Sequence, residues 1–183
     1  MNSRTITVAR FAAAAAAATA LTLACSQAAD AAPATPKSSA SQSIAPCTAS
    51  NTKVTVTPVS RPINHLLLTA TNTGKSTCAA YYAPALRWDA DQQAPVTVLQ
   101  DSVPQAVVTL EPGQSAYAGI MTDSPDGSGT NGHTVSSIDV YFTDASNQGS
   151  VGDPARPSAP GTYVDDSAWV TYWQSSPDLA LAY

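Results

Sequence analysis

Charged side chains are scarce in this sequence, at 11% of 183 residues, and the eight Lys and Arg residues are scattered along the chain. So few dispersed cations cannot form the basic surface that a nucleic-acid-binding protein needs. The exposed faces of a soluble helical bundle normally carry more Glu and Lys than this chain offers. Fourteen prolines, many Ser and Thr residues and three cysteines indicate an exported β protein instead.

No hydrophobic run is long enough to span a membrane. The apolar stretch at 11–24 is too short for a transmembrane helix. It follows a basic segment with Arg4 and Arg10 and no acid, which is the pattern of a secretory signal peptide. The two arginines are not adjacent, so we expect the general secretion route rather than the twin-arginine route.

The end of this signal resembles a bacterial lipoprotein signal, in which a small residue precedes a cysteine that becomes lipidated. The residues are Thr22-Leu23-Ala24-Cys25, and Thr22 stands where leucine is usual. We therefore predict a signal peptide at 1–25 and a lipid anchor on Cys25 at the outer face of the cytoplasmic membrane. The alternative is free secretion after cleavage at Ala28 or Ala31, where small residues are suitably spaced.

The three cysteines support export independently. Cys25 is either lipidated or removed, which leaves Cys47 and Cys78, an even number in an oxidising compartment. We predict that these two form a disulfide bond. Two free buried thiols or a metal site are the alternatives, although no Cys-x-x-Cys or paired-histidine spacing supports a metal. The sequence predicts no cofactor.

Residues 26–46 are rich in Ala, Ser and Pro and contain one large apolar side chain, Ile44. Such a segment cannot bury enough apolar surface to offset its ordering entropy. We predict a disordered linker with a coil dimension on the order of 25 Å, which would hold a domain at 47–183 away from the membrane. Without Arg4 and Arg10, six basic residues face thirteen acidic ones, a formal charge of −7.

From Cys47 onward the apolar residues recur with a period of two, the period of β-strands. The clearest alternation places Ile138, Val140 and Phe142 on one strand face. Turn signals separate the strands, among them Glu111-Pro112-Gly113-Gln114, which suits a type II turn. We predict an antiparallel β-sandwich of seven or eight short strands, with long loops at 123–134 and 144–162 and no helix after residue 25. The predicted strands lie within 54–57, 63–72, 78–88, 96–99, 106–110, 115–122, 135–143 and 168–174.

Three segments resemble the domain-of-unknown-function family 4232 (DUF4232) of secreted proteins and lipoproteins of actinobacteria. These are the opening Cys47, Leu-Leu-Leu-Thr-Ala-Thr-Asn-Thr-Gly-Lys-Ser-Thr-Cys ending at Cys78, and Val-Thr-Leu-Glu-Pro-Gly-Gln-Ser-Ala at 108–116. The resemblance covers about residues 47–175. It implies an immunoglobulin-like sandwich and no known activity, so no catalytic residue is carried over.

Motifs for enzymatic chemistry are missing. Gly74-Lys75-Ser76 lacks the preceding glycine of a phosphate loop, and we interpret it as a turn. Nucleophilic catalysis would need Ser or Cys beside a histidine, but no Gly-x-Ser-x-Gly elbow accompanies His65 or His133. We predict that the protein is not an enzyme and that both histidines are structural.

The loop 123–132 contains Asp123, Asp126 and Asn131, so calcium binding is one interpretation. The aspartate spacing misses the EF-hand pattern. The other interpretation is a flexible hairpin loop whose Asp, Asn and Gly residues tolerate left-handed backbone geometry. We favour the second.

Aromatic residues offer a possible binding surface for a glycan or a protein, because Trp and Tyr dominate recognition. Alternation along 168–174 places Trp169 and Trp173 on one face and Val170 and Tyr172 on the other. Both tryptophans would be exposed if Val170 and Tyr172 face the core. The interpretation we favour is that the proline-rich segment 147–162 covers them. The candidate surface residues are Tyr81, Tyr82, Trp169 and Trp173.

Together these features predict a membrane-tethered extracytoplasmic module that binds an envelope protein or a glycan, or that organises the envelope. The alternative function is a secreted hydrolase-type enzyme that uses the sandwich as a scaffold.

Overall fold

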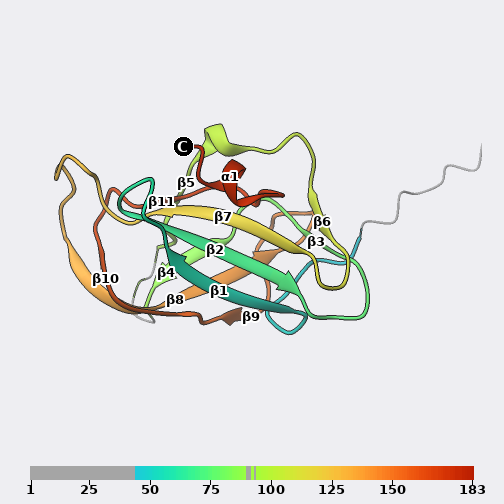
Figure 1. Cartoon of the computed structure of the whole chain (residues 1–183). Helices are drawn as coiled ribbons and strands as arrows, with labels where there is room; N and C mark the ends of the chain where they lie inside the picture. Colours follow the sequence, from blue (N-terminus) through green and yellow to red (C-terminus); the bar gives the residue numbers. More distant parts are fainter. Residues whose placement is uncertain (1–43, 90–91, 93) are drawn as a thin grey trace, which may run out of the picture. The chain divides into compact units, whose positions relative to one another are not determined.

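The computed structural model describes residues 44–89, 92 and 94–183. The predicted signal peptide, Cys25 and residues 26–43 of the predicted linker lie outside the described residues. The described part contains eleven strands, one 3-10 turn and one short helix (Figure 1). Their bounds are β1 Thr52–Pro58, β2 His65–Asn72, β3 Cys78–Ala80, β4 Ala85–Trp88, β5 Thr97–Val98, η1 Gln100–Ser102, β6 Val108–Leu110, β7 Ser115–Met121, β8 His133–Thr143, β9 Ser150–Ala155, β10 Ser158–Val164, β11 Trp169–Val170 and α1 Pro177–Ala180.

The larger sheet has five strands in the order β1-β2-β7-β11-β5. All neighbours are antiparallel except β5 and β11, which pair in parallel. In the register of β2 and β7, Leu66 pairs with Ile120 and Leu68 with Ala118. All four side chains are buried, so the alternation predicted for β2 sets one core face of the sandwich.

The second sheet has the order β10-β8-β4, and β9 pairs with β8 on the β10 side. The predicted inward residues of β8, Ile138, Val140 and Phe142, are almost completely buried. Full burial of each such side chain stabilises the fold by about 1.5–3 kcal/mol. On the opposite face of β8, Asp139 is also buried and is paired with Arg156 at 2.9 Å.

The two sheets pack face to face around one core, which confirms the predicted β-sandwich. The two sheets come into contact along two edges of the sandwich. The outer strand β1 contacts β10 on one side. On the other side, β4 and the segment before β5 are joined by the bond from Val96 N to Leu86 O, 2.8 Å long. The immunoglobulin-like topology stays a prediction.

A small two-stranded sheet, β3-β6, lies beside the sandwich and contains the predicted disulfide. Cys47 and Cys78 are buried and bonded, with a sulfur–sulfur distance of 2.07 Å. The predicted type II turn follows β6, with Gly113 at φ 87° and a bond from Gln114 N to Glu111 O. The sequence therefore predicted both the covalent link and the turn correctly.

One segment differs from the prediction. Residues 144–162, expected as a loop, contain β9 and most of β10. Both strands pair only with β8, so their prolines lie on an edge strand, where a missing backbone N–H is tolerated. A single-turn helix, α1, also forms after β11, where no helix was expected, and the Ser176 hydroxyl accepts from Leu179 N at its start.

Candidate functional site

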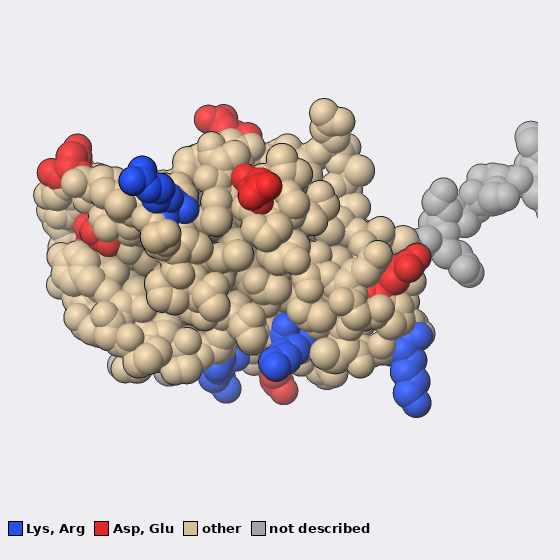
Figure 2. Space-filling view, in the orientation of Figure 1, with Lys and Arg blue, Asp and Glu red and all other residues tan. Residues whose placement is uncertain are grey.

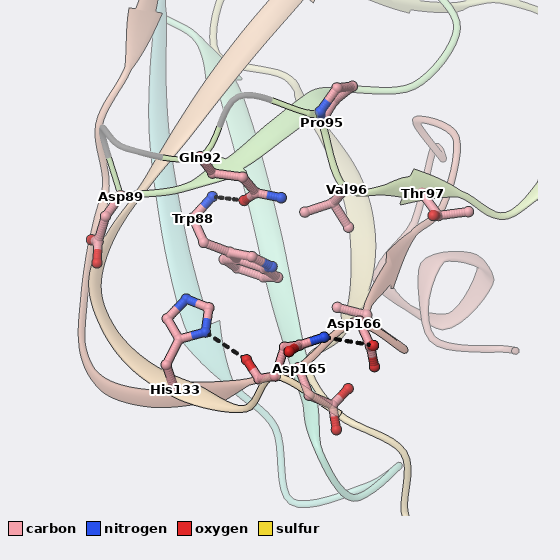
Figure 3. Close-up of a pocket in the computed structure, with 11 residues that line it drawn as sticks. Trp88, Asp89, Gln92, Pro95, Val96, Thr97, His133, Asp165 and Asp166 are labelled. Atoms are coloured by element: carbon pink, nitrogen blue, oxygen red, sulfur yellow. Dashed lines mark hydrogen bonds between the residues drawn. The ribbon is translucent and has the colours of Figure 1, made fainter. Parts of the chain in front are cut away.

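Two hollows lie at opposite ends of β4, on the side where the two sheets are joined through Val96. The first, which we call the cleft, has a volume of about 500 Å³ at the end of β4 (Figure 3). The second, which we call the cup, has a volume of about 320 Å³ at the start of β4. The cleft is defined by Trp88, Asp89, Asn131, His133, Asp165 and Asp166. The cup is defined by Tyr82, Pro84, Gln100, Phe142, Asn147 and Tyr172.

Trp88 is the last residue of β4 and supplies the aromatic wall of the cleft. Leu86 and Trp88 alternate inward along β4, and Trp88 is only 5% exposed. Its backbone N–H donates to Oε1 of Gln92 at 2.6 Å. Figure 3 shows the indole between the His133 side of the cleft and Val96.

Asp89 follows Trp88 directly, with φ at 51°, in the left-handed region that Asp tolerates better than most residues. Its Oδ1 accepts from the N–H of Ser136 and from both the N–H and the hydroxyl of Ser137. Desolvation raises the pKa of Asp89, but these hydrogen bonds and nearby His133 outweigh it, so the pKa lies below its ordinary value. The carboxylate is therefore ionised at neutral pH.

The opposite wall comes from Asp165 and Asp166, which lock the loop 123–134 in place. Thr130 donates to Asp166 through its N–H, at 2.6 Å, and through its hydroxyl, and the Asn131 amide donates to the same carboxylate at 3.2 Å. The bonds from Thr130 and Asn131 lower the pKa of Asp166 despite some opposing desolvation. A Cβ added at Gly129 would collide with the Asp165 carboxylate, so glycine is needed for this close approach.

The aspartates of the loop 123–134 are occupied by bonds to its own and neighbouring residues. Asp123 accepts from the Asn64 amide at 2.8 Å and from the Thr122 hydroxyl at 2.7 Å. Asp126 accepts from the Ser124 hydroxyl and from Ser128 N, and bonds from these two serines lower its pKa to about 2. Within the described ranges, no three His, Cys, Asp or Glu side chains are grouped so that they could hold a metal ion.

The predicted left-handed geometry of this loop is present at Gly127 and Asn131, with φ at 70° and 56°. Its packing differs from the flexible hairpin that the sequence suggested. The Asp166 bonds and the close approach of Gly129 to Asp165 dock the loop on the segment after β10.

The two histidines lie in different sheets. His133, at the start of β8, is exposed and donates through Nδ1 to Asn131 O at 3.1 Å. His65, in β2, is 7% exposed and donates through Nδ1 to Ile63 O. Its ring meets Trp169 edge-on at 5.3 Å, and its Nε2 has no hydrogen-bond partner among the described residues.

The cleft is anionic. Asp89, Asp165 and Asp166 line it, and none of the described residues around it is Lys or Arg. On the face shown in Figure 2, the Lys, Arg, Asp and Glu side chains are scattered over the surface. An anionic, aromatic-walled hollow attracts positively charged groups and disfavours anions.

The cup has a different lining. It contains two tyrosines, Phe142, two side-chain amides and hydroxyl groups, and none of the described residues around it is charged. The Tyr82 hydroxyl donates to Ala145 O at 3.0 Å, and the Tyr172 hydroxyl donates to Oε1 of Gln100 at 3.2 Å. Both rings are therefore held in place by their hydroxyl groups.

The aromatic surface predicted from Tyr81, Tyr82, Trp169 and Trp173 does not exist as one surface. Trp173 is 1% exposed and stacks on Phe142 at 5.5 Å in the core. Tyr81 is buried, and its hydroxyl donates to Ile44 O. Only Tyr82, 39% exposed, lines the cup, together with Tyr172.

The Trp169 ring lies edge-on to His65 of β2, and the Trp173 ring stacks on Phe142 of β8. Coverage of these rings by the 147–162 segment stays a prediction. Alternation across 168–174 fails because β11 ends at Val170, so Thr171 and Tyr172 no longer follow a strand period. The residues of the cleft were missed as a group. No local signal in the sequence places Asp89, Asp165 and Asp166 beside Asn131.

Comparison with known proteins identifies the domain. Residues 47–174 match the family described as a domain of unknown function, DUF4232. The chain belongs to this family. The residues that define the cleft and the cup all lie inside the matched range. No curated protein and no solved structure matches the chain.

One observation bears on where the DUF4232 domain resides. The Cys47–Cys78 disulfide is consistent with a location outside the cytoplasm, where thiols are oxidised. In the part of the chain that the structure describes, no helix is long and apolar enough to cross a membrane.

Proposed function

We propose that this DUF4232 domain is a non-catalytic binding module, displayed outside the cytoplasmic membrane, that holds a positively charged group of its ligand in the cleft. The observation that carries the proposal is the combination of the Trp88 wall with carboxylates on both sides and no Lys or Arg among the described residues that line it. A cation near an indole gains about 0.5–2 kcal/mol from the ring quadrupole. Carboxylates add electrostatic attraction in the same hollow.

The cleft supports binding better than catalysis. A general acid or base works best with a pKa near the working pH, whereas the pKa values of Asp89 and Asp166 are held below the ordinary aspartate value. Their oxygens accept hydrogen bonds from Ser136, Ser137 and Thr130, which fixes them as part of the scaffold. Such bonds preorganise a binding site and lower the cost of ordering it.

The second part of the proposal is that the domain is tethered to the membrane. The lipoprotein-like Thr22-Leu23-Ala24-Cys25 and the Ala/Ser/Pro-rich segment 26–46 support a lipid anchor followed by a spacer. An anchored module would present the cleft to an envelope protein or glycan that carries an amine. Mass spectrometry of the native protein tests the anchor directly: we expect a diacylglycerol adduct on Cys25, and an N-terminus at residue 29 or 32 instead would establish free secretion.

The binding proposal is tested by following the Trp88 indole resonance of the full chain by NMR. Tetramethylammonium should shift this resonance, and tert-butanol, its neutral counterpart of similar shape, should not. Asp166→Asn should weaken tetramethylammonium binding about twofold to fivefold. Asp153→Asn, which removes the same charge from an exposed position on β9, is the matched control and should have no effect.

The alternative function, a hydrolase-type enzyme, predicts the opposite result. If tetramethylammonium leaves Trp88 unchanged and the full chain turns over chromogenic esters or glycosides, the binding proposal fails. Loss of that turnover in His65→Ala or His133→Ala would then identify the base of a hydrolase.

A further inference from the structure

The cup is built from segments that are far apart in the sequence. Its walls come from the β3–β4 connection, the start of η1, the end of β8, the β8–β9 hairpin and Tyr172, two residues after β11. Phe142 forms part of the lining and is supported from behind by the buried indole of Trp173, parallel to it within 9°. The cup therefore has a rigid aromatic base that belongs to the core.

Tyr82 has an unusual backbone conformation. Its φ of 55° lies in the left-handed region, where a bulky side chain is rarely found. The bond from Trp173 N to Tyr82 O, 3.0 Å long, and the bond from its hydroxyl to Ala145 O hold it there. Residues kept in such conformations concentrate at ligand sites. Asn147, on the same cup, also has a positive φ, at 52°.

Both tyrosine hydroxyls are already used within the protein, as described above, and Tyr172 is further fixed by its N–H, which donates to the Ser102 hydroxyl at 2.9 Å. The ring faces are therefore the parts of Tyr82 and Tyr172 that a ligand can use. Polar groups at the rim remain available, because no bond is made by the Asn147 side-chain N–H groups or the Ser150 hydroxyl among the described residues.

We propose that the cup is a second binding site, separate from the cleft, that takes one neutral sugar ring. The C–H face of a pyranose packs on an aromatic ring, and its hydroxyls bond to amide and hydroxyl groups, which are the two kinds of group this cup supplies. A charged ligand would lose its hydration here without meeting an opposite charge, which is unfavourable.

A proline-rich peptide is the other ligand that aromatic linings bind, but it needs an open groove along which an extended chain can lie. The cup is closed on one side, because the Tyr82 hydroxyl is bonded across to Ala145 in the β8–β9 hairpin. A single ring fits such a hollow better than a continuing chain.

The experiment is saturation-transfer and shift-mapping NMR on the full chain with methyl glucoside, methyl galactoside and N-acetylglucosamine. We expect at least one of these neutral sugars to shift resonances of Tyr82, Asn147 and Tyr172 and to leave Trp88 unchanged. Glucuronate, which carries a negative charge, should not bind the cup.

Two variants preserve the backbone while removing the contacts. Tyr82→Gly and Asn147→Gly both allow a positive φ, and we expect about threefold to tenfold weaker sugar binding in each. Tyr183→Ala, which removes an exposed tyrosine from the C-terminus outside the cup, is the matched control and should bind normally. Unchanged sugar affinity in both glycine variants would overturn the assignment of the site.

The remaining outcomes separate this inference from the proposed function. If no neutral sugar binds while tetramethylammonium still shifts Trp88, the inference on the cup is wrong and the binding function of the cleft stands. If a proline-rich peptide, and no sugar, shifts the Tyr82 and Tyr172 resonances, the cup is a peptide site and the sugar proposal is wrong.

Discussion

The cleft and the cup lie at the two ends of the same four-residue strand, β4, yet their chemistry is opposite. The cleft has three carboxylates beside one tryptophan, and the cup has two tyrosines, amides and no described charge. Each contains two non-glycine residues with positive φ, Asp89 and Asn131 in the cleft and Tyr82 and Asn147 in the cup. The edge strand β4 contributes residues to both hollows, so their difference comes from the connections that meet at each end. One edge of the sandwich therefore carries two hollows of different chemistry.

Of the changes we predict, removal of the disulfide should have the largest effect. The disulfide lies nearer in sequence to the cup than to the cleft. Cys78 begins β3, which leads directly to Tyr82. Replacing both cysteines, Cys47→Ala with Cys78→Ala, should lower the free energy of unfolding by roughly 3.5–4 kcal/mol, because the unfolded chain regains the entropy of a loop of about 32 residues. Urea unfolding with and without reductant measures it.

At temperatures where this double variant stays folded, sugar binding in the cup should weaken more than cation binding in the cleft. Equal weakening of both would show that the two hollows are not independent.

A smaller effect, confined to the cleft, is expected from Gly129→Ala. The new Cβ collides with the Asp165 carboxylate and pushes the loop 123–134 off its support, which should cost about 1–3 kcal/mol of stability. Thermal unfolding gives the change, and the cup should keep its affinity. Adding Asp165→Ala removes the collision, so a double-mutant cycle should give a favourable coupling. Purely additive costs would contradict direct contact between loop and carboxylate.

The smallest and most selective effect is expected when the pH is lowered. The folded pKa values of Asp89 and Asp166 lie below 3.8, so their stabilising contribution is complete above that pH and is lost as the pH falls through the lowered values. In a His133→Gln variant, which removes the ionisable imidazole from the cleft, cation binding should stay constant from pH 7 to about pH 4 and then decline.

Sugar binding in the cup should not change over the same range, because no described acid lines it. Carbon-detected NMR titration of the aspartates is the measurement, and it should also find the pKa of Asp126 lowered to about 2 by the bonds from Ser124 and Ser128. A cleft carboxyl that titrates above pH 5 would favour the enzyme alternative.

The strands that alternate most clearly were predictable from sequence. The inward residues of β2 and β8 follow a strict period of two, and each is buried as expected, including Leu68 and Phe142. Strands β9 and β10 were missed, because Gly152, Pro154 and Pro160 lower local strand propensity. Pairing along β8 stabilises these strands, and that pairing is a tertiary property.

Prediction of the binding surface was less successful. Clustered aromatic residues suggested a binding surface at Trp169 and Trp173. Trp173 is instead buried in the core, where its indole stacks on Phe142. Burial of a large aromatic side chain contributes more than its exposure to a possible ligand. Tyr82 and Tyr172 lie at the surface because the segments that carry them leave the strands at the open edge of the sandwich.

By itself, the sequence determined the β class, the Cys47–Cys78 pair, the Gly113 turn and the family, because strand period, turn chemistry and cysteine number are properties of short stretches of chain. Only the tertiary structure decided which side chains meet. Trp88 and Asp166 share the cleft, and Tyr82 and Tyr172 share the cup, through packing of segments with no local relation. These contacts depend on how all the strands pack around one core, and no single stretch of sequence specifies that packing.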